Sequence, residues 1–326
     1  MPSAITVSAG TLSAAGLDTR MLDCWQATLA LALVAHGVQD VLPVLGAQWW
    51  FGPPAVPGGP PLLDPMPEAD LLEHRTGLRP LDRPVAPKGL RSQCDRELAA
   101  GRLPLVVTDG FVLPWCPYYG VRHIEHSFAV TGTAPDGLLV VDAYDNRTEW
   151  GRAEPLDTVA TATVVDAIER APGSRLATLL PTGSSGPADP LAPLRATAGA
   201  LADWTGSDPY AWFVEECRGA DVGEVAFQRF CESCWTIERR RRLFAVWLDT
   251  LVRLPGEPLP NGFPDTYRGQ VVAAWSEVNR FAYLALRRVR AGRRATLGAV
   301  GDLVAAAAAA ERASAAELVA WLARDR

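Results

Sequence analysis

The spacing of apolar residues predicts one long buried helix near the start of the chain. Between Leu22 and Gly37 the residues are mostly Ala and Leu, carry almost no charge and include no internal Pro or Gly. Such a run is typical of a helix that is buried on most sides. Asp23 is a suitable N-cap, because its carboxylate can accept backbone N–H groups of the first turn, and Gly37 can end the helix.

Shorter patterns predict the elements that follow. Two more helices are expected at Asp70–Gly77 and Gly89–Gly101. Apolar, β-branched runs bounded by turn residues are typical of strands, and they occur at Ile5–Val7, Leu103–Thr108, Glu125–Thr133, Leu138–Tyr144, Thr158–Val165 and Leu176–Leu180. Helices first and strands later favour an α+β fold with an antiparallel sheet over alternating α/β.

The last part of the chain is expected to be helical. Residues 182–193, T-G-S-S-G-P-A-D-P-L-A-P, have the composition of a linker. The sequence therefore predicts a first domain at 1–181 and a helical C-terminal domain at 194–326. The strongest helical patterns in that second domain are Phe227–Val252, Val271–Arg290 and Leu297–Leu322.

Composition and charge narrow the function classes. The 326 residues are 48% hydrophobic and 21% charged, as in an ordinary globular protein. The net charge is −8 over residues 1–190 and +2 over 191–326, so neither part has the strongly basic character of a nucleic-acid-binding domain. No apolar run reaches membrane-spanning length and we find no signal peptide, so the six cysteines are expected to be reduced in a cytoplasmic protein. The oligomeric state stays open.

Candidate chemistry begins at Cys24, the first residue of the predicted long helix. A thiol at a helix N-terminus feels the positive end of the helix dipole, which favours the thiolate. A buried central helix that begins with Cys is the arrangement of a papain-type nucleophile. The alternative is that Cys24 is a small apolar core residue, so the choice depends on whether a base and an orienting group lie nearby.

A cysteine nucleophile needs a base, and the chain has four histidines. His36 ends the same helix about 18 Å from Cys24 at a rise of 1.5 Å per residue, which is too far. His74 lies in a charged helix typical of a protein surface. His123 and His126 remain, and both flank the start of a predicted strand.

Asp142 is the one charge in an otherwise apolar strand, where a carboxylate is costly unless it is paired. The imidazole of His126 on the neighbouring strand would pair with it. If the hairpin is centred on Pro135, Asp142 lies opposite Phe128, which shares a face with His126. A loop of odd length gives this register, whereas a strict two-residue loop at Pro135-Asp136 would put the two side chains on opposite faces.

Other interpretations of these residues stay open. His126 can be a satisfied core histidine, and Asp142 can be a turn residue at the end of its strand. Asp145 and Asn146 are further candidates for the group that orients the base.

Three segments together resemble a known family. They are D-C-W-Q-A-T-L-A-L-A-L-V-A-H-G at the predicted helix, H-S-F-A-V-T-G from His126, and V-V-D ending at Asp142. With the Trp/Phe-Gly cluster after the helix, they resemble the N-terminal domain of the butirosin-biosynthesis (BtrH-type) acyltransferases, in the peptidase C39-like, papain-fold group. The resemblance implies a papain-like domain whose central helix packs on an antiparallel sheet. It also implies a triad with Cys24 as nucleophile, His126 as base and Asp142 as the orienting residue.

The activity that the resemblance implies is acyl transfer in secondary-metabolite (antibiotic) biosynthesis. An acyl or aminoacyl group would pass from the thioester of an acyl or peptidyl carrier protein, through an acyl-Cys24 intermediate, to a small-molecule amine or hydroxyl acceptor. The 4′-phosphopantetheine would belong to the carrier, and neither a cofactor nor a metal is expected on this chain. The alternatives are a cysteine hydrolase with the same triad (a thioesterase, amidase or peptidase) and a non-catalytic binding scaffold.

One departure from the papain pattern bears on the reaction. Papain-like enzymes usually place a Gln a few residues before the Cys to donate into the oxyanion hole. This chain has Asp18 six residues before Cys24, and no Gln occurs before Cys24. The expected donors are then the backbone N–H of Cys24 together with Gln26 or Trp25. Because amide cleavage depends most on the oxyanion hole, the departure favours thioester exchange.

Aromatic segments are expected to surround the substrate. Trp49, Trp115 and Tyr118 are the candidate lining residues. With the Pro-rich loop 52–67, segments 48–52 and 111–119 could form a lid that keeps water out. The alternative is ordinary surface packing of Pro and aromatic residues.

Two arginine clusters in the helical region are candidates for docking an acidic carrier protein. The alternative is a pair of solvated helix faces. The Cys231-x-x-Cys234 motif lacks a second pair at zinc spacing, so structural cysteines are expected there. The candidate docking residues are Arg240, Arg241, Arg287 and Arg288.

Overall fold

The computed structural model describes residues 6–52, 68–183, 189–204, 210–218, 224–256, 259–293 and 298–324. The chain forms two compact units: a first unit of Met1–Val41 with Leu72–Gly186, and a second unit of Leu42–Leu71 with Pro187–Arg326. The prediction of a continuous domain over 1–181 differs from this division, because residues 42–71 belong to the second unit. Most of the Pro-rich loop 52–67 and part of the linker 182–193 lie outside the described residues.

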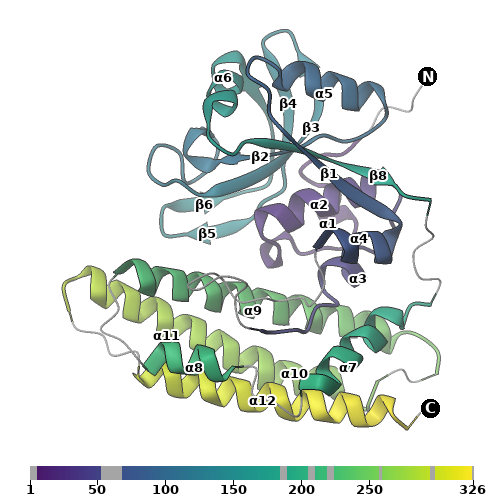
Figure 1. Ribbon diagram of the computed structural model, residues 1–326, viewed down its shortest axis with the longest axis vertical. Helices are drawn as coiled ribbons and strands as arrows, with labels where there is room; N and C mark the ends of the chain where they lie inside the picture. The colour runs from purple at the N-terminus through teal and green to yellow at the C-terminus, as the bar shows by residue number, and fades with distance from the viewer. Residues whose placement is uncertain are drawn as a thin grey trace. The chain divides into compact units, whose positions relative to one another are not determined.

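The first unit is built around a sheet in which every pair of neighbouring strands is antiparallel (Figure 1). In spatial order the described strands are β1 (Leu78–Pro84), β8 (Arg175–Pro181), β2 (Leu105–Asp109), β3 (Glu125–Ala134), β4 (Gly137–Asp142) and β7 (Leu156–Thr161). Two short strands, β5 (Asn146–Thr148) and β6 (Gly151–Ala153), form a separate ribbon. The predicted α+β class with an antiparallel sheet is confirmed.

Strand β1 was not predicted from the sequence, and its composition explains why. It contains Pro80 and Pro84 and pairs only with β8. Because Pro cannot donate to a strand ladder, a strand with two prolines is tolerated only at the edge of a sheet. The same prolines hide the alternation that marks a strand in the sequence.

The predicted strand Thr158–Val165 is only partly correct. Strand β7 ends at Thr161, and helix α6 (Ala162–Arg170) begins at the next residue. Val165 and Ile168 are the buried residues of α6, and their spacing of three places both on one helical face. A short apolar run fits either element, and here the helical spacing prevailed.

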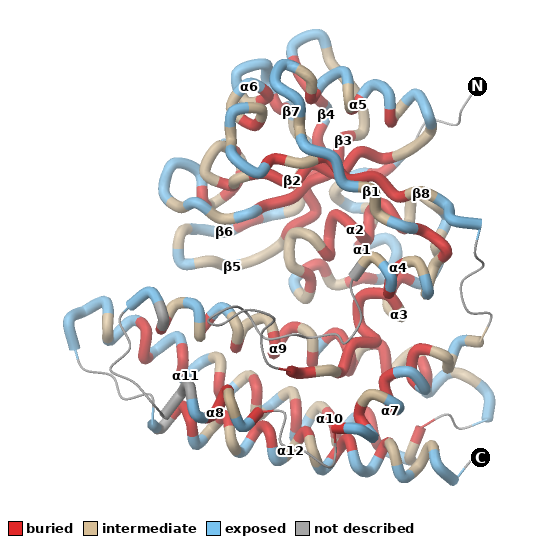
Figure 2. Tube along the Cα trace, viewed as in Figure 1, coloured by how far each residue is buried: buried red, intermediate tan, exposed pale blue. Residues whose placement is uncertain are grey.

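Helices cover both faces of the sheet. Helix α2 (Cys24–Ala35) packs on one face of β3, where Ser127 Oγ donates to Thr28 Oγ1 over 3.2 Å. Helices α5 (Leu90–Ala99) and α6 pack on the opposite face, in one apolar cluster with Phe128 and Val130. Figure 2 shows that α2 is buried along most of its length, as its Ala/Leu-rich sequence predicts.

Short helical segments connect these elements. The remaining ones are α1 (Thr11–Ala14), a 3-10 turn at Thr19–Met21, α4 (Glu68–Thr76) and a 3-10 turn at Gly110–Val112.

The second unit is helical in its described residues. Its helices are α3 (Leu42–Leu45), α7 (Ala192–Trp204), α8 (Ala211–Arg218), α9 (Glu224–Val252), α10 (Phe263–Tyr267), α11 (Ala273–Arg290) and α12 (Gly298–Leu322), with a π-helical turn at Arg268–Val272. Helix α11 packs along α9 and α12, and α12 also contacts α7 and α8. The predicted helical C-terminal region is confirmed. Across the described residues, no helix combines the length and apolar character needed to cross a membrane.

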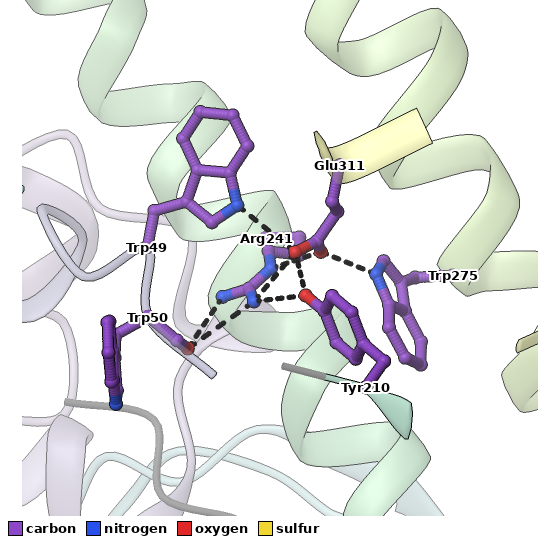
Figure 3. Close-up of polar contacts among 6 residues, drawn as sticks. All are labelled: Trp49, Trp50, Tyr210, Arg241, Trp275 and Glu311. Carbon is purple, nitrogen blue, oxygen red and sulfur yellow. Dashed lines mark hydrogen bonds and ion pairs between the residues drawn. The ribbon is translucent and has the colours of Figure 1, made fainter. Parts of the chain in front are cut away.

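A buried ion pair lies in the core of the second unit (Figure 3). The side chains of Arg241 on α9 and Glu311 on α12 are fully buried, and Arg241 Nε donates to Glu311 Oε1 over 2.5 Å. The same carboxylate accepts the indole N–H of Trp49 at 3.2 Å, the indole N–H of Trp275 at 2.5 Å and the hydroxyl of Tyr210. Charges are tolerated at this depth because their polar atoms find partners inside the protein.

Candidate active site

Cys24 is the first residue of α2, and the local sequence explains why the helix begins there. The Asp23 side chain accepts the backbone N–H of Gln26 at 2.7 Å, and the Gln26 side chain accepts the backbone N–H of Asp23 at 3.1 Å. This reciprocal capping box fixes the start of the helix. Cys24 is therefore held where the helix dipole is positive, and its side chain is partly exposed.

His126 and Asp142 form a buried pair on neighbouring strands. His126 Nε2 lies 2.7 Å from Asp142 Oδ2, and the two side chains are 1% and 5% exposed. An ionised carboxylate can only accept, so Nε2 is the nitrogen that carries the proton in this contact. The structure therefore brings together the two residues that the strand pattern paired.

The hairpin loop alone would not produce this pair. Ala134 pairs with Gly137, so the loop holds only the two residues Pro135-Asp136. A two-residue loop puts His126 and Asp142 on opposite faces of the hairpin, because side chains alternate along each strand.

A β-bulge restores the register. The pairing shifts between Val130 and Gly132, which leaves one extra residue on β3. On the far side of the bulge Ala129 pairs with Val141. The imidazole and the carboxylate thereby return to the same face, which the sequence analysis had assigned to a loop of odd length.

Asp142 accepts two further hydrogen bonds. The indole Nε1–H of Trp115 donates to Oδ2 over 3.0 Å, and the backbone N–H of Tyr144 donates to Oδ1 over 3.0 Å. With His126, three donors surround one buried carboxylate. Such a set of donors holds the anion in one orientation and offsets the cost of its burial.

The second nitrogen of His126 remains available for proton transfer. His126 Nδ1 is buried and makes no hydrogen bond within the described residues. Burial lowers the pKa of His126, but the facing Asp142 carboxylate and the thiols of Cys116 and Cys24 raise it well above its ordinary value. The raised pKa makes the imidazole a better acceptor of a proton, and Nδ1 is the atom left to exchange one with a thiol.

The thiol of Cys24 lies beside the start of β3. Its Sγ is 3.9 Å from the backbone carbonyl oxygen of Glu125, the residue before His126. A thiol, an imidazole and a carboxylate in series form the arrangement of a cysteine nucleophile with its base and orienting group. These groups can form a thiolate–imidazolium pair and attack a carbonyl carbon.

A short chain of hydroxyl groups borders the imidazole. The ring of Tyr144 packs edge-on against His126 with the ring centroids 5.4 Å apart. Asn146 Nδ2 donates to the Tyr144 hydroxyl over 2.6 Å, and that hydroxyl lies 3.4 Å from the hydroxyl of Tyr118. Burial raises the pKa of Tyr118, so it stays a neutral hydroxyl. Tyr118 thus belongs to the cluster around His126. The recorded hydrogen bond of Asn146 goes to Tyr144 and not to the imidazole.

The expected oxyanion donors lie at the start of α2. Gln26 Oε1 is occupied by the capping box, and its Nε2 is buried without a hydrogen-bond partner in the part of the chain that is described. Trp25 is half-buried next to Cys24. As the first residue of the helix, Cys24 has no intrahelical acceptor for its own backbone N–H.

His123 and Asp145, the other candidates for base and orienting group, have different partners. His123 is exposed, its Nδ1 lies 2.5 Å from Asp109 Oδ2, and its ring stacks on Phe111 at 4.3 Å. Asp145 Oδ2 accepts the hydroxyl of Thr19 over 3.3 Å.

Two residues assigned to binding from the sequence are core residues of the second unit. Arg241 is fully buried against Glu311, so the prediction that it docks a carrier is wrong. Trp49, expected to line the substrate site, is buried and its indole donates to the same carboxylate. Local sequence could not reveal either outcome, because the burial comes from helices far away in the chain.

The other arginines and the C-x-x-C motif are placed as follows. Arg240 donates to the side chain of Gln48. Arg287 and Arg288 are exposed in the last turn of α11, where positive charge also stabilises the helix end. The motif's cysteines, Cys231 and Cys234, are buried and form no disulfide within the described residues.

The sequence pattern assigns no role to Cys116, and the structure places its thiol within interaction distance of His126. Cys116 is buried in the loop between β2 and β3, and its thiol raises the pKa of His126 more than Cys24 does. The dense aromatic and Pro content of that loop was the only signal. No group of three or more His, Cys, Asp and Glu side chains in the described ranges could hold a metal ion.

No protein-family model matches the chain, and the curated proteins searched contain no match either. Support for a function therefore comes from the geometry of Cys24, His126 and Asp142 and from the sequence resemblance.

Proposed function

We propose that the chain is a cysteine-dependent acyltransferase of papain-like, C39-like fold, which acts in secondary-metabolite biosynthesis as its resemblance to the BtrH-type family implies. The observation that carries the proposal is the series of three groups in the first unit. Asp142 holds His126 Nε2 at 2.7 Å, and Nδ1 of the same ring is unpaired near the Cys24 thiol. That order is the one a thiol nucleophile requires.

The proposed reaction has two steps. His126 Nδ1 takes the proton of Cys24, and the thiolate attacks the carbonyl carbon of the carrier-protein thioester. The tetrahedral intermediate expels the carrier thiolate, which takes the proton from His126 and leaves acyl-Cys24. An amine acceptor then attacks this thioester, His126 accepts the amine proton, and the proton returns to the Cys24 sulfur as the amide leaves.

The start of α2 supports a thioester donor over a peptide. Without a Gln before Cys24, the oxyanion donors at hand are the Cys24 backbone N–H and the unpartnered Nε2 of Gln26. A thioester is already activated and depends less on these donors than an amide does. Because acyl-Cys24 is itself a thioester, its formation is close to isoenergetic, and attack by an amine is downhill.

Mass spectrometry of the intact chain tests the proposal. A series of acyl N-acetylcysteamine thioesters serves as the donor probe. We expect an adduct of the acyl mass on the wild-type chain and none on Cys24→Ala. A small primary amine should then discharge the adduct to an amide. Discharge to the free acid in the presence of the amine would make the protein a hydrolase, and absence of any adduct with every donor would contradict the proposal.

A further inference from the structure

The loop between β2 and β3 places the indole of Trp115 beside Asp142 of the candidate triad. Trp115 Nε1 donates to Asp142 Oδ2 over 3.0 Å, and His126 Nε2 reaches the same oxygen at 2.7 Å. The other oxygen, Oδ1, is held by the backbone N–H of Tyr144 at 3.0 Å. The oxygen that orients the base is thus the one that the indole also holds.

The indole is fixed in place by the strand that carries the base. Its ring packs edge-on against Phe128 with the ring centroids 5.5 Å apart. Phe128 is fully buried on β3, two residues after His126 and on the same face. A side chain held by such packing cannot swing away from the carboxylate without losing that contact.

We propose that Trp115 is a positioning residue of the Cys24–His126–Asp142 site, acting through Asp142; this role rests on the proposed function. The indole N–H stabilises the Asp142 anion and fixes its plane, so that Oδ2 stays aligned with His126 Nε2. The imidazole then keeps one orientation, with Nδ1 available to exchange a proton with the Cys24 thiol. Trp115 is also predicted to line the substrate; the contacts that give it a positioning role are those with Asp142 and Phe128.

Loss of the indole N–H should make the reactive ion pair harder to form in acid. The Trp115 indole N–H favours the anionic form of Asp142 over the neutral carboxyl. The thiolate–imidazolium pair of Cys24 and His126 needs that anion to stabilise the imidazolium. A hydrogen bond to a charged group changes the balance between the charged and neutral forms by roughly 10- to 100-fold. In Trp115→Phe the acid limb of Cys24 reactivity should therefore move to higher pH by about one unit.

The test is the rate of Cys24 alkylation by iodoacetamide between pH 4 and 9, with the modified residue located by peptide mass. Trp150→Phe is the matched control, because Trp150 packs on Tyr118 at 5.5 Å and under Arg122 at 4.5 Å and makes no recorded contact with Asp142 in the described structure. We expect the acid limb to shift in Trp115→Phe and to stay at the wild-type pH in Trp150→Phe. An unchanged acid limb in Trp115→Phe, or an equal shift in both variants, would overturn the positioning role.

A second measurement covers the case in which Trp115→Phe does not fold. In the ¹⁵N-tryptophan-labelled wild type, the indole N–H resonance of Trp115 should move as His126 titrates and should move again in Asp142→Asn, while that of Trp150 should not. A Trp115 resonance that ignores both changes would contradict the contact.

The two proposals fail in different ways. If wild-type Cys24 reacts no faster than free N-acetylcysteine below neutral pH, the proposed function fails. If Cys24 is fast in the wild type and Trp115→Phe keeps its acid limb, only the positioning role fails.

Discussion

Replacing Glu311 by Gln removes one charge from the core of the second unit and almost no volume. The Arg241 guanidinium then stays buried without a counter-charge. Besides the side chain at position 311, its partners are the hydroxyl of Tyr210 at 3.3 Å and the carbonyl oxygen of Trp50 at 3.4 and 3.5 Å. Burial lowers the pKa of Arg241, and Glu311 more than offsets this, so the wild-type guanidinium is charged.

The size of the effect follows from what the carboxylate holds. Breaking a buried ion pair by removing one partner costs about 3–5 kcal/mol. Oε1 accepts from Arg241 and Trp275, and Oε2 accepts from Arg241, Trp49 and Tyr210. Gln keeps only one of these two oxygens, so at least two donors also lose an acceptor. The expected loss in the free energy of unfolding is therefore near the upper end of that range, about 5 kcal/mol. That is comparable to the whole stability of many domains, roughly 5–15 kcal/mol.

Urea unfolding followed by tryptophan fluorescence and far-UV circular dichroism measures this loss. The matched control is Glu277→Gln on α11, whose pair with Arg280 is 3.6 Å long with side chains 51% and 65% exposed. An exposed pair of this kind contributes about 0–1 kcal/mol, so the control should unfold close to the wild-type urea concentration. In 1 M salt the loss in Glu311→Gln should persist, because a buried pair is screened little.

A loss in Glu311→Gln within about 0.5 kcal/mol of the loss in Glu277→Gln would refute the reasoning, since it would mean that the buried guanidinium does not need its counter-charge.

Three further predictions concern the first unit. His126→Ala should lower the rate of acyl-Cys24 formation by about 10²-fold or more, while His123→Ala should leave it near the wild-type rate by intact mass; the reverse order would move the base to His123. Asp142→Asn should lower that rate less than His126→Ala does, and an unchanged rate would shift the orienting role to Asp145 or Asn146. Because the folded pKa of His126 is raised above its ordinary value of 6.5, its pairing stabilises the fold fully below that pH and less as the pH rises through the raised value. The difference in melting temperature between wild type and Asp142→Asn should therefore shrink from pH 6 to pH 9, and a difference that grows would contradict this sign.

Features set by neighbouring residues were predictable from the sequence. The start of α2 depends on Asp23 and Gln26, which lie within one turn of Cys24 and cap each other's backbone. The paired strands β3 and β4 are joined by a turn of only two residues, so their pairing is local as well. Both sides of the candidate site were therefore visible before any tertiary contact was known.

The register of the site was not predictable, although the pair itself was. The sequence showed that His126 and Asp142 share a face only if the pairing of β3 with β4 is offset by one residue, and it assigned that offset to a loop of odd length. The loop has two residues, and the bulge between Val130 and Gly132 provides the one-residue offset. The local signal for the bulge is Gly132, since an isolated Gly within a strand often marks a bulge, but a Gly does not by itself fix which residue is left over.

By itself the sequence determined the α+β order of elements, the capped helix that begins with Cys24, and the pairing of an apolar strand's only carboxylate with His126. Only the tertiary structure decided that the Trp115 indole donates a hydrogen bond to Asp142 and that the Cys116 thiol interacts with the His126 imidazole. It also decided that Arg241 is a core residue and not a docking residue. The physical reason is the range of the interactions. Caps and turns act over a few residues, whereas the partner that satisfies a buried charge can come from anywhere in the chain, as Glu311 does for Arg241.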